Sequence, residues 1–154
     1  MARGAEEVVR IAVLNGPNLN LLGTREPAVY GHDTLDDVER RLRGVATELG
    51  IDVEFAQRNG EGELVDCVQG LRGHAQGAVI NAGAYSHSSL ALRDAFASVS
   101  VPYVEVHVSN IFAREPERRH SMLAGGAVGI ICGLGSAGYE FALRGLVTHL
   151  TARA

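Results

Sequence analysis

The stretch Arg10-Ile11-Ala12-Val13-Leu14-Asn15 decides the fold, because it is an apolar run of strand length that ends at Gly16-Pro17. A short apolar run that contains β-branched residues and is bounded by turn residues is typical of a buried strand. The segment that follows, residues 18–32, has no clear hydrophobic period. Segments of this length inside compact domains are usually lids or binding loops, so we expect a strand followed by a lid or binding loop.

Helical and strand-like segments alternate along the rest of the chain. Thr34 is a predicted N-cap with Asp37 as its capping-box partner, and Gly50 is a plausible stop for the helix between them. Further strands are predicted at residues 51–55, 78–81, 103–108 and 127–132, and further helices at residues 61–74, 88–98 and 137–152. Repeated strand–helix units imply right-handed crossovers. We therefore expect one α/β domain: a flavodoxin-like, doubly wound, five-stranded parallel sheet with helices on both faces.

Polar side chains follow the predicted strands at their carboxyl ends, where ligands bind in sheets of this kind. They are amides, imidazoles and hydroxyls with few carboxylates, and they lie in residues 15–20, 57–61, 81–87 and 105–110. Such a set suits a polar, hydroxylated small molecule. It does not suit a divalent metal bound by several carboxylates.

The composition excludes several kinds of chemistry. The chain of 154 residues has no lysine, which rules out a lysine Schiff base, a pyridoxal-phosphate lysine and a Walker-A lysine. The formal charge of −4 argues against general nucleic-acid binding, and Cys67 and Cys132 form neither a disulfide framework nor a metal motif. No apolar run approaches the ~20 residues of a membrane span, and the first residues do not resemble a secretory signal. We expect a cytoplasmic protein in which residues 1–8 form a flexible tail.

Two pairs of residues are candidates for acid–base chemistry. Glu105 and His107 lie two apart on a predicted strand and share a face, as in a general acid with its supporting carboxylate or as in a simple polar pair at a strand end. Arg25 and Tyr30 lie in the long loop. A guanidinium within about 4–6 Å favours the tyrosinate, which would supply a strong base without lysine. The alternative is that these two loop residues are unrelated.

Two further motifs have a functional and a structural interpretation. Arg114 and Arg118 share a face if their segment is helical, where they could hold an anion or form a solvated charged surface. The run Gly133-Leu134-Gly135-Ser136-Ala137-Gly138 matches the dinucleotide fingerprint, but it opens the last predicted unit, with no later strand for the ribose-binding acid. We therefore interpret it as close packing of a helix on a strand.

Several blocks of sequence together resemble type II 3-dehydroquinate dehydratase, from about residue 10 to residue 150. The first is Leu14-Asn15-Gly16-Pro17-Asn18-Leu19-Asn20-Leu21-Leu22-Gly23, which is followed by Arg25-Glu26-Pro27 and Tyr30-Gly31. Others lie at residues 59–64, 80–87, 91–95, 105–111, 113–115, 133–135 and 138–139. Each motif alone is weak, but motifs in register across the whole domain are highly specific.

The resemblance implies loss of water from 3-dehydroquinate to give 3-dehydroshikimate, on the route to aromatic compounds, through an enolate and with neither metal nor cofactor. By position it implies that Tyr30 is the base, acting as tyrosinate, and that Arg25 activates it from a lid. It implies that His107 is the general acid, supported by Glu105, and that Asn18 holds a water on the enolate oxygen. The implied substrate-binding groups are the side chains of Asn81, His87 and Arg118 and the backbone amides of Val108 and Ser109.

The resemblance also implies a homo-oligomer, typically a dodecamer built from trimers, in which Asp94 reaches into a neighbouring subunit's site. Three residues depart from the family pattern: Gly60, Phe112 and Pro116. Because a proline begins or breaks a helical turn, the last of these leaves open whether Arg118 or Arg119 faces the substrate.

Two other classes of protein share this fold class. A binding protein for a flavin or nucleotide is compatible with it, since fold does not determine function. However, the chain has no tryptophan, and Pro17 lacks the N–H that a phosphate nest would use. A phospho-acceptor receiver domain needs acidic strand ends and a lysine, which this sequence does not offer.

Overall fold

The strands of the computed structural model, which describes residues 7–152, form one parallel sheet in the order β2-β1-β3-β4-β5. They are β1 (Arg10–Asn15), β2 (Asp52–Gln57), β3 (Gly77–Asn81), β4 (Tyr103–His107) and β5 (Gly129–Cys132). The register aligns Asn15 of β1 with Asn81 of β3, so the carboxyl ends of the central strands meet. The expected tail over residues 1–8 falls outside the described residues, apart from residues 7 and 8.

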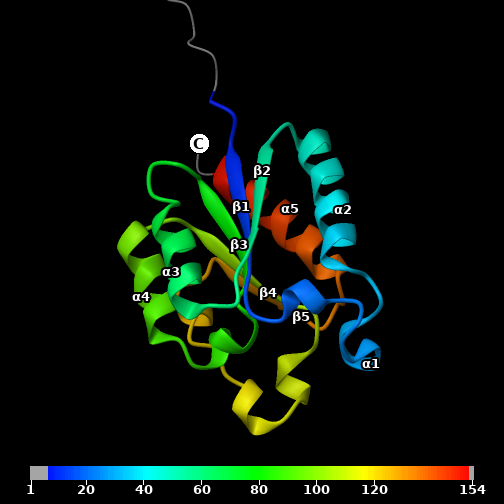
Figure 1. Cartoon of the computed structure of the whole chain (residues 1–154). Coiled ribbons are helices and arrows are strands. Elements are labelled where there is room, and N and C mark those ends of the chain that lie inside the picture. Colours follow the sequence, from blue (N-terminus) through cyan, green and yellow to red (C-terminus); the bar gives the residue numbers. More distant parts are fainter. Residues whose placement is uncertain (1–6, 153–154) are drawn as a thin grey trace, which may run out of the picture.

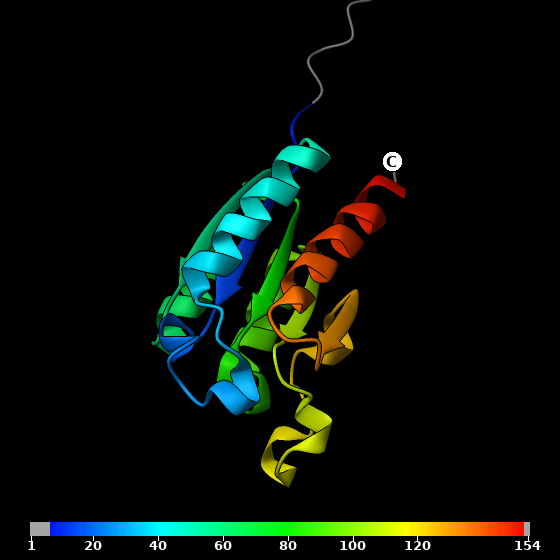
Figure 2. The same cartoon turned by 90° about the vertical axis from the view of Figure 1, so that its right-hand side faces the viewer.

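Helices cover both faces of the sheet, as Figures 1 and 2 show. Their bounds are α1 (Pro27–Tyr30), α2 (Leu35–Leu49), α3 (Glu61–Gln69), α4 (Leu90–Val99) and α5 (Ala137–Ala152). Short 3-10 turns lie in the connections: η1 (Leu19–Leu21), η2 (Gly83–His87), η3 (Ile111–Ala113), η4 (Pro116–Arg118) and η5 (Ala124–Gly126). The predicted flavodoxin-like doubly wound fold is confirmed.

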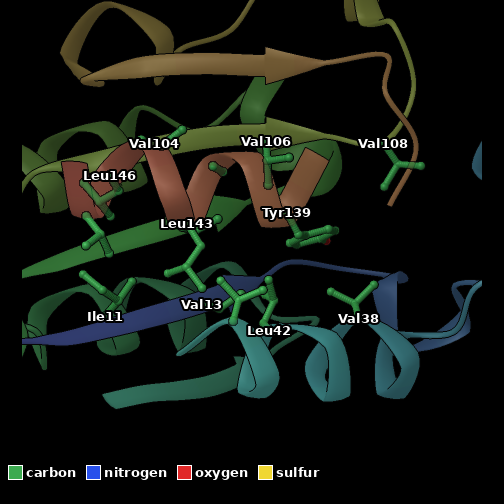
Figure 3. Close-up of a cluster of buried hydrophobic side chains, with 14 of the residues drawn as sticks. Ile11, Val13, Val38, Leu42, Val104, Val106, Val108, Tyr139, Leu143 and Leu146 are labelled. Atoms are coloured by element: carbon green, nitrogen blue, oxygen red, sulfur yellow. The ribbon is translucent and has the colours of Figure 1, made fainter. Parts of the chain in front are cut away.

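Two apolar cores lie on the two faces of the sheet. On one face, α2 and α5 pack on Ile11 and Val13 of β1 and on the valines of β4 (Figure 3). On the other face, α3 and α4 pack on Ala12, Leu14 and Ile80. Successive side chains of β1 therefore point into opposite cores. This explains why residues 11–14 are all apolar and do not alternate with polar residues.

The helix signals give both ends of α2 and the start of α3 correctly, but the end of α3 incorrectly. Thr34 caps α2 in the predicted capping box with Asp37, and Gly50 ends the helix in the left-handed conformation. The helix predicted over residues 61–74 is wrong over residues 70–74, because α3 stops at Gln69 and Gly70 begins a run of turns. Leu71 is buried although it lies outside the helix. Its apolar side chain continues the helical spacing of α3, and the sequence therefore predicted one more turn.

The glycine-rich run before α5 is a packing motif, as the sequence predicted. A Cβ on Gly138 would lie 3.2 Å from a methyl group of Val106 and 3.5 Å from one of Ile131. The missing side chain lets α5 lie directly on β4 and β5. Within residues 7–152, no helix is long and apolar enough to cross a membrane. The cytoplasmic location stays a prediction.

Candidate active site

A cavity of about 150 Å³ lies at the carboxyl ends of β1, β3 and β4, where the strand order reverses. Doubly wound sheets bind their ligands at this position. Most of the residues predicted for the site line it: Asn18, Arg25, Tyr30, Asn81, His87, His107, Val108, Ser109 and Arg118. The larger and more open grooves on the described part of the chain contain few or none of these residues, so the small cavity is the candidate site.

The floor of the cavity depends on a close approach of the loops after β1 and β3. A Cβ on Gly16 would lie 2.3 Å from the carbonyl oxygen of Ala82, so only glycine fits there. The next turn places Asn18 in the left-handed conformation (φ 69°), and its N–H donates to Oδ1 of Asn59 at 3.1 Å. Asn59, which follows β2, therefore helps to present Asn18 to the cavity.

The loop between β1 and α2 contributes Arg25 and Tyr30 to the cavity. Its backbone packs closely on itself, and its last residues are hydrogen-bonded to the rest of the protein. At its start, Gly23 has φ +89°, and a Cβ there would lie 2.7 Å from the carbonyl oxygen of His32. At its end, Ser136 donates to Asp33 at 2.5 Å and Arg41 donates to the same carboxylate at 2.9 Å. These contacts lower the pKa of Asp33 below its ordinary value of 3.8. We call this loop, residues 16–34, the lid.

Tyr30 lies at the tip of this lid between two arginines. The Arg25 guanidinium carbon lies 5.1 Å from the Tyr30 ring centroid, and that of Arg114 lies 5.3 Å from it. Nη1 of Arg114 donates to the phenolic oxygen at 2.9 Å and reaches Oγ of Ser109 at 3.5 Å. Two guanidinium groups therefore flank one phenol. Arg25 and Tyr30 are therefore neighbours, and Arg114 makes the direct contact.

Glu105 and His107 form a buried pair under the cavity. Glu105 is fully buried and His107 is 5% exposed. Oε2 of the carboxylate and Nε2 of the imidazole are hydrogen-bonded. An ionised carboxylate only accepts hydrogen bonds, so Nε2 carries a proton and Nδ1 is the ring nitrogen left for a ligand.

His87 is oriented by a reciprocal contact with His120. Nδ1 of His87 lies 2.7 Å from the carbonyl oxygen of His120, and Nε2 of His120 lies 2.7 Å from the carbonyl oxygen of His87. A carbonyl oxygen only accepts, so both nitrogens carry protons and His87 keeps Nε2 as an acceptor when it is neutral. Burial is the main reason why the pKa of His87 lies below its ordinary value, which favours this neutral form.

Asn81 is held from below by a buried tyrosine. The Tyr139 hydroxyl donates to Oδ1 of Asn15 at 2.5 Å and accepts from Nδ2 of Asn81 at 2.9 Å. Oδ1 of Asn81 accepts from the N–H of Gly83 at 3.2 Å. Burial raises the pKa of Tyr139, so this hydroxyl remains protonated. The chain Asn15–Tyr139–Asn81 fixes the amide at the edge of the cavity.

Because of Pro116, the sequence left open whether Arg118 or Arg119 faces the cavity, and the structure distinguishes them. Pro116 begins η4, which turns Arg118 towards the cavity, where Nε donates to Glu115 at 2.5 Å. Nε of Arg119 instead donates to the backbone oxygen of Arg114 at 2.6 Å. Arg118 therefore lines the cavity, whereas Arg119 does not.

Asp94 is the one predicted site residue that lies elsewhere. It is on α4, in a separate groove of about 840 Å³. Among residues 7–152, no cluster of three or more histidine, cysteine, aspartate or glutamate side chains is arranged to hold a metal ion.

Some residues of the site were not predicted from the sequence. The sequence left Arg114 between two interpretations, and the structure makes it a cavity residue with an 18% exposed side chain. Asn59, His120 and Tyr139 act through other residues. Each of them contacts a residue in a distant segment, and no local sequence pattern indicates that contact.

Comparison with known proteins gives a consistent result. The sequence pattern of the family described as "Dehydroquinase class II" matches residues 9–147. A 3-dehydroquinate dehydratase of Gemmatimonas aurantiaca is 64% identical over 140 residues, 91% of this chain and 92% of that protein. A catabolic 3-dehydroquinase of Penicillium rubens is 56% identical over 133 residues, 86% of each chain.

Solved structures agree with the sequence comparison. The type II dehydroquinase of Propionibacterium acnes superposes with a TM-score of 0.86 at 43% identity, covering 92% of this chain and 99% of that one. The enzyme of Butyrivibrio crossotus gives a TM-score of 0.88 at 40% identity, covering 90% and 97%. The chain therefore belongs to the class II dehydroquinase family, a family of hydro-lyases.

Proposed function

We propose that this chain removes water from 3-dehydroquinate to give 3-dehydroshikimate through an enolate, with Tyr30 as base and His107 as acid. The activity itself follows from membership of the family. The observation that carries the mechanism is the position of the Tyr30 phenol, which contacts Arg114 on the same small cavity as the His107–Glu105 pair. The proposed base and the proposed acid thus line the same cavity.

In the first step the Tyr30 phenolate takes a proton from the carbon next to the ketone. The electron pair of that C–H bond forms a carbon–carbon double bond, and the π pair of the carbonyl moves to the ketone oxygen, which gives the enolate. Arg25 and Arg114 favour the phenolate before the transfer, because two guanidinium groups flank it. Asn18, in the loop after β1, orients a water towards the enolate oxygen.

In the second step the enolate collapses and the hydroxyl across the new double bond leaves. His107 gives it a proton from Nδ1, which produces water, while Nε2 keeps its hydrogen bond to Glu105. The proton taken up by Tyr30 is then released to solvent and His107 is protonated again. This route needs no imine, which is compatible with a chain that contains no lysine.

The other predicted residues hold the substrate in this orientation. The N–H groups of Val108 and Ser109, directly after β4, take the carboxylate. Neutral His87 accepts a hydrogen bond at Nε2 from a substrate hydroxyl, and Asn81 and Arg118, which also line the cavity, bind the remaining oxygens. Fixed donors and acceptors of this kind select a polyhydroxylated ring.

The function is tested by the appearance of conjugated-enone absorbance from 3-dehydroquinate in the presence of a chelator. Tyr30→Phe and His107→Ala each lower kcat by at least about 10²-fold, the usual contribution of a general acid or base. Tyr30→Phe still binds substrate in a calorimetric titration. Tyr103→Phe, which removes a phenol away from the cavity, is the matched control and keeps its activity. A fully active Tyr30→Phe enzyme would remove Tyr30 as the base.

We further propose that the chain works as an oligomer, a dodecamer built from trimers, in which Asp94 completes a neighbouring site. Asp94 supports this because it lies in a groove away from the cavity of its own chain. Asp94→Ala is expected to raise KM, with analytical ultracentrifugation reporting the assembly. A fully active monomer in that measurement contradicts the shared site.

A further inference from the structure

Ser121 lies behind the site, between η4 and η5, and its hydroxyl makes three hydrogen bonds. Oγ donates to Oε1 of Glu105 at 2.6 Å and accepts from the N–H groups of Leu123 at 3.0 Å and Ala124 at 3.1 Å. A hydroxyl has one proton to donate and two lone pairs. Since the two backbone N–H groups occupy both lone pairs, the proton of Ser121 is directed at Glu105.

The carboxylate of Glu105 depends on this donor because it is fully buried. A buried carboxylate stays charged only when it is paired and hydrogen-bonded. Ser121 occupies one of its oxygens and His107 the other. Both oxygens of this buried carboxylate are therefore hydrogen-bonded.

We propose that Ser121 is a positioning residue for the general acid, which keeps Glu105 anionic so that His107 carries the proton given to the departing hydroxyl. This inference rests on the proposed function, because Ser121 acts only through His107. The proton leaves Nδ1 for the hydroxyl and forms water. The imidazole becomes neutral, and Glu105 and Ser121 keep their hydrogen bonds throughout.

Other titratable or charged groups lie near the pair. The His87 ring lies stacked 6.1 Å from the His107 ring. Burial, and the charge of Glu105, raise the pKa of Tyr103 to about 12, so this phenol is neutral during turnover. The remaining charges at the cavity are the arginines Arg25, Arg114 and Arg118.

The experiment compares the pH profile of kcat in variants at position 121. Ser121→Ala removes the donor to Glu105, so kcat falls about 10-fold, the effect of losing one hydrogen bond to a charged group. The alkaline limb of the profile moves to higher pH, since the proton is held more tightly by a less stabilised carboxylate. KM changes little, because Ser121 does not contact the substrate cavity.

A matched pair separates the hydroxyl from the shape of the side chain. Ser121→Thr keeps the hydroxyl and restores the wild-type profile, whereas Ser121→Val has the same shape without it and behaves like Ser121→Ala. Tyr103→Phe loosens the same turn from the other side, since the Tyr103 hydroxyl donates to Leu123 at 2.5 Å, and it leaves the pH profile unchanged.

His107→Ala is measured in the same assay. If His107→Ala is inactive while both Ser121→Ala and Ser121→Val keep the wild-type kcat profile, the role of Ser121 is wrong and the proposed function stands. An active His107→Ala enzyme overturns the proposed function instead. An equal loss of kcat in the threonine and valine variants shows that Ser121 is needed only for its size, which also contradicts the proposal.

Discussion

At the scale of single residues, Arg114 connects the two halves of the proposed chemistry. It lies in the segment after β4 and donates to the phenol of Tyr30, a residue 84 positions earlier in the chain. The same guanidinium nitrogen reaches Ser109, whose N–H is proposed to bind the carboxylate. One side chain thus connects the lid to the loop that is proposed to hold the substrate.

Arg114→Leu is therefore expected to lower kcat/KM by about 10²–10³-fold, the effect of removing one preorganised donor from a developing charge. Arg114→Lys recovers only part of this, because an ammonium group lacks the planar fork of a guanidinium. Steady-state kinetics on the purified variants measure the effect. Arg40→Leu, at a side chain that is 77% exposed on α2, is the control and retains full activity.

Two buried serines near η2 offer a test of stability at the same scale. Within residues 7–152, Oγ of Ser86 is buried without a hydrogen-bond partner, whereas Oγ of Ser89 accepts from the N–H of Leu92 as the N-cap of α4. Ser86→Ala is expected to raise the free energy of unfolding by about 1 kcal/mol, and Ser89→Ala to lower it by about 1 kcal/mol. Urea denaturation of both variants measures the difference, and the same sign for both would contradict this account.

At the scale of elements, the lid and α5 act together. Asp33 at the end of the lid accepts from Ser136 at 2.5 Å, directly before α5 begins, and from Arg41 of α2 at 2.9 Å. The contacts lie outside the cavity, yet they decide where the lid is attached. A lid that loses this attachment spends less time with Tyr30 over the substrate.

Asp33→Asn and Ser136→Ala are each expected to lower kcat/KM several-fold without changing the pH profile of the reaction. The stabilisation given by Asp33 is present above its ordinary pKa of 3.8 and is lost only as the pH falls through its lower value in the folded protein, so the attachment is constant near neutrality. Proteolysis of the lid provides a second measurement. Equal cleavage rates in wild type and both variants would exclude the attachment.

The elements that the sequence predicted well are those whose signals are local. The apolar run of β1 and the capping box of α2 each lie within a few residues, so the pattern contains all the information. The end of α3 was missed because Leu71 is buried by tertiary packing and not by a helical turn. The contacts of Arg114 with Tyr30 and of Tyr139 with Asn81 join distant segments, and only the assembled sheet brings them together.

At the scale of the whole molecule, the protein has two buried tyrosines, Tyr103 at the start of β4 and Tyr139 in α5. Burial is the largest cause of the raised pKa of each, to about 12 for Tyr103. A group whose pKa is raised on folding binds its proton more tightly in the folded state. The free energy of unfolding therefore falls as the pH rises above the ordinary tyrosine value of 10.

We expect this loss to begin near pH 10 and, for Tyr103 alone, to reach about 2 kcal/mol by pH 12. Urea denaturation at a series of alkaline pH values measures it. Tyr103→Phe starts from a lower stability, because it lacks the hydrogen bond to Leu123, but shows a shallower decline. A decline equally steep in this variant would contradict the assignment.

The same two phenols have a practical consequence for studying the base. The chain has no tryptophan and four tyrosines, so its near-ultraviolet absorption comes mainly from phenols. Tyr103 and Tyr139 stay protonated near neutral pH and therefore contribute no tyrosinate band there. In a Tyr85→Phe background, any tyrosinate band that grows in below pH 9 belongs to Tyr30, so the charge on the lid can be read directly by absorbance.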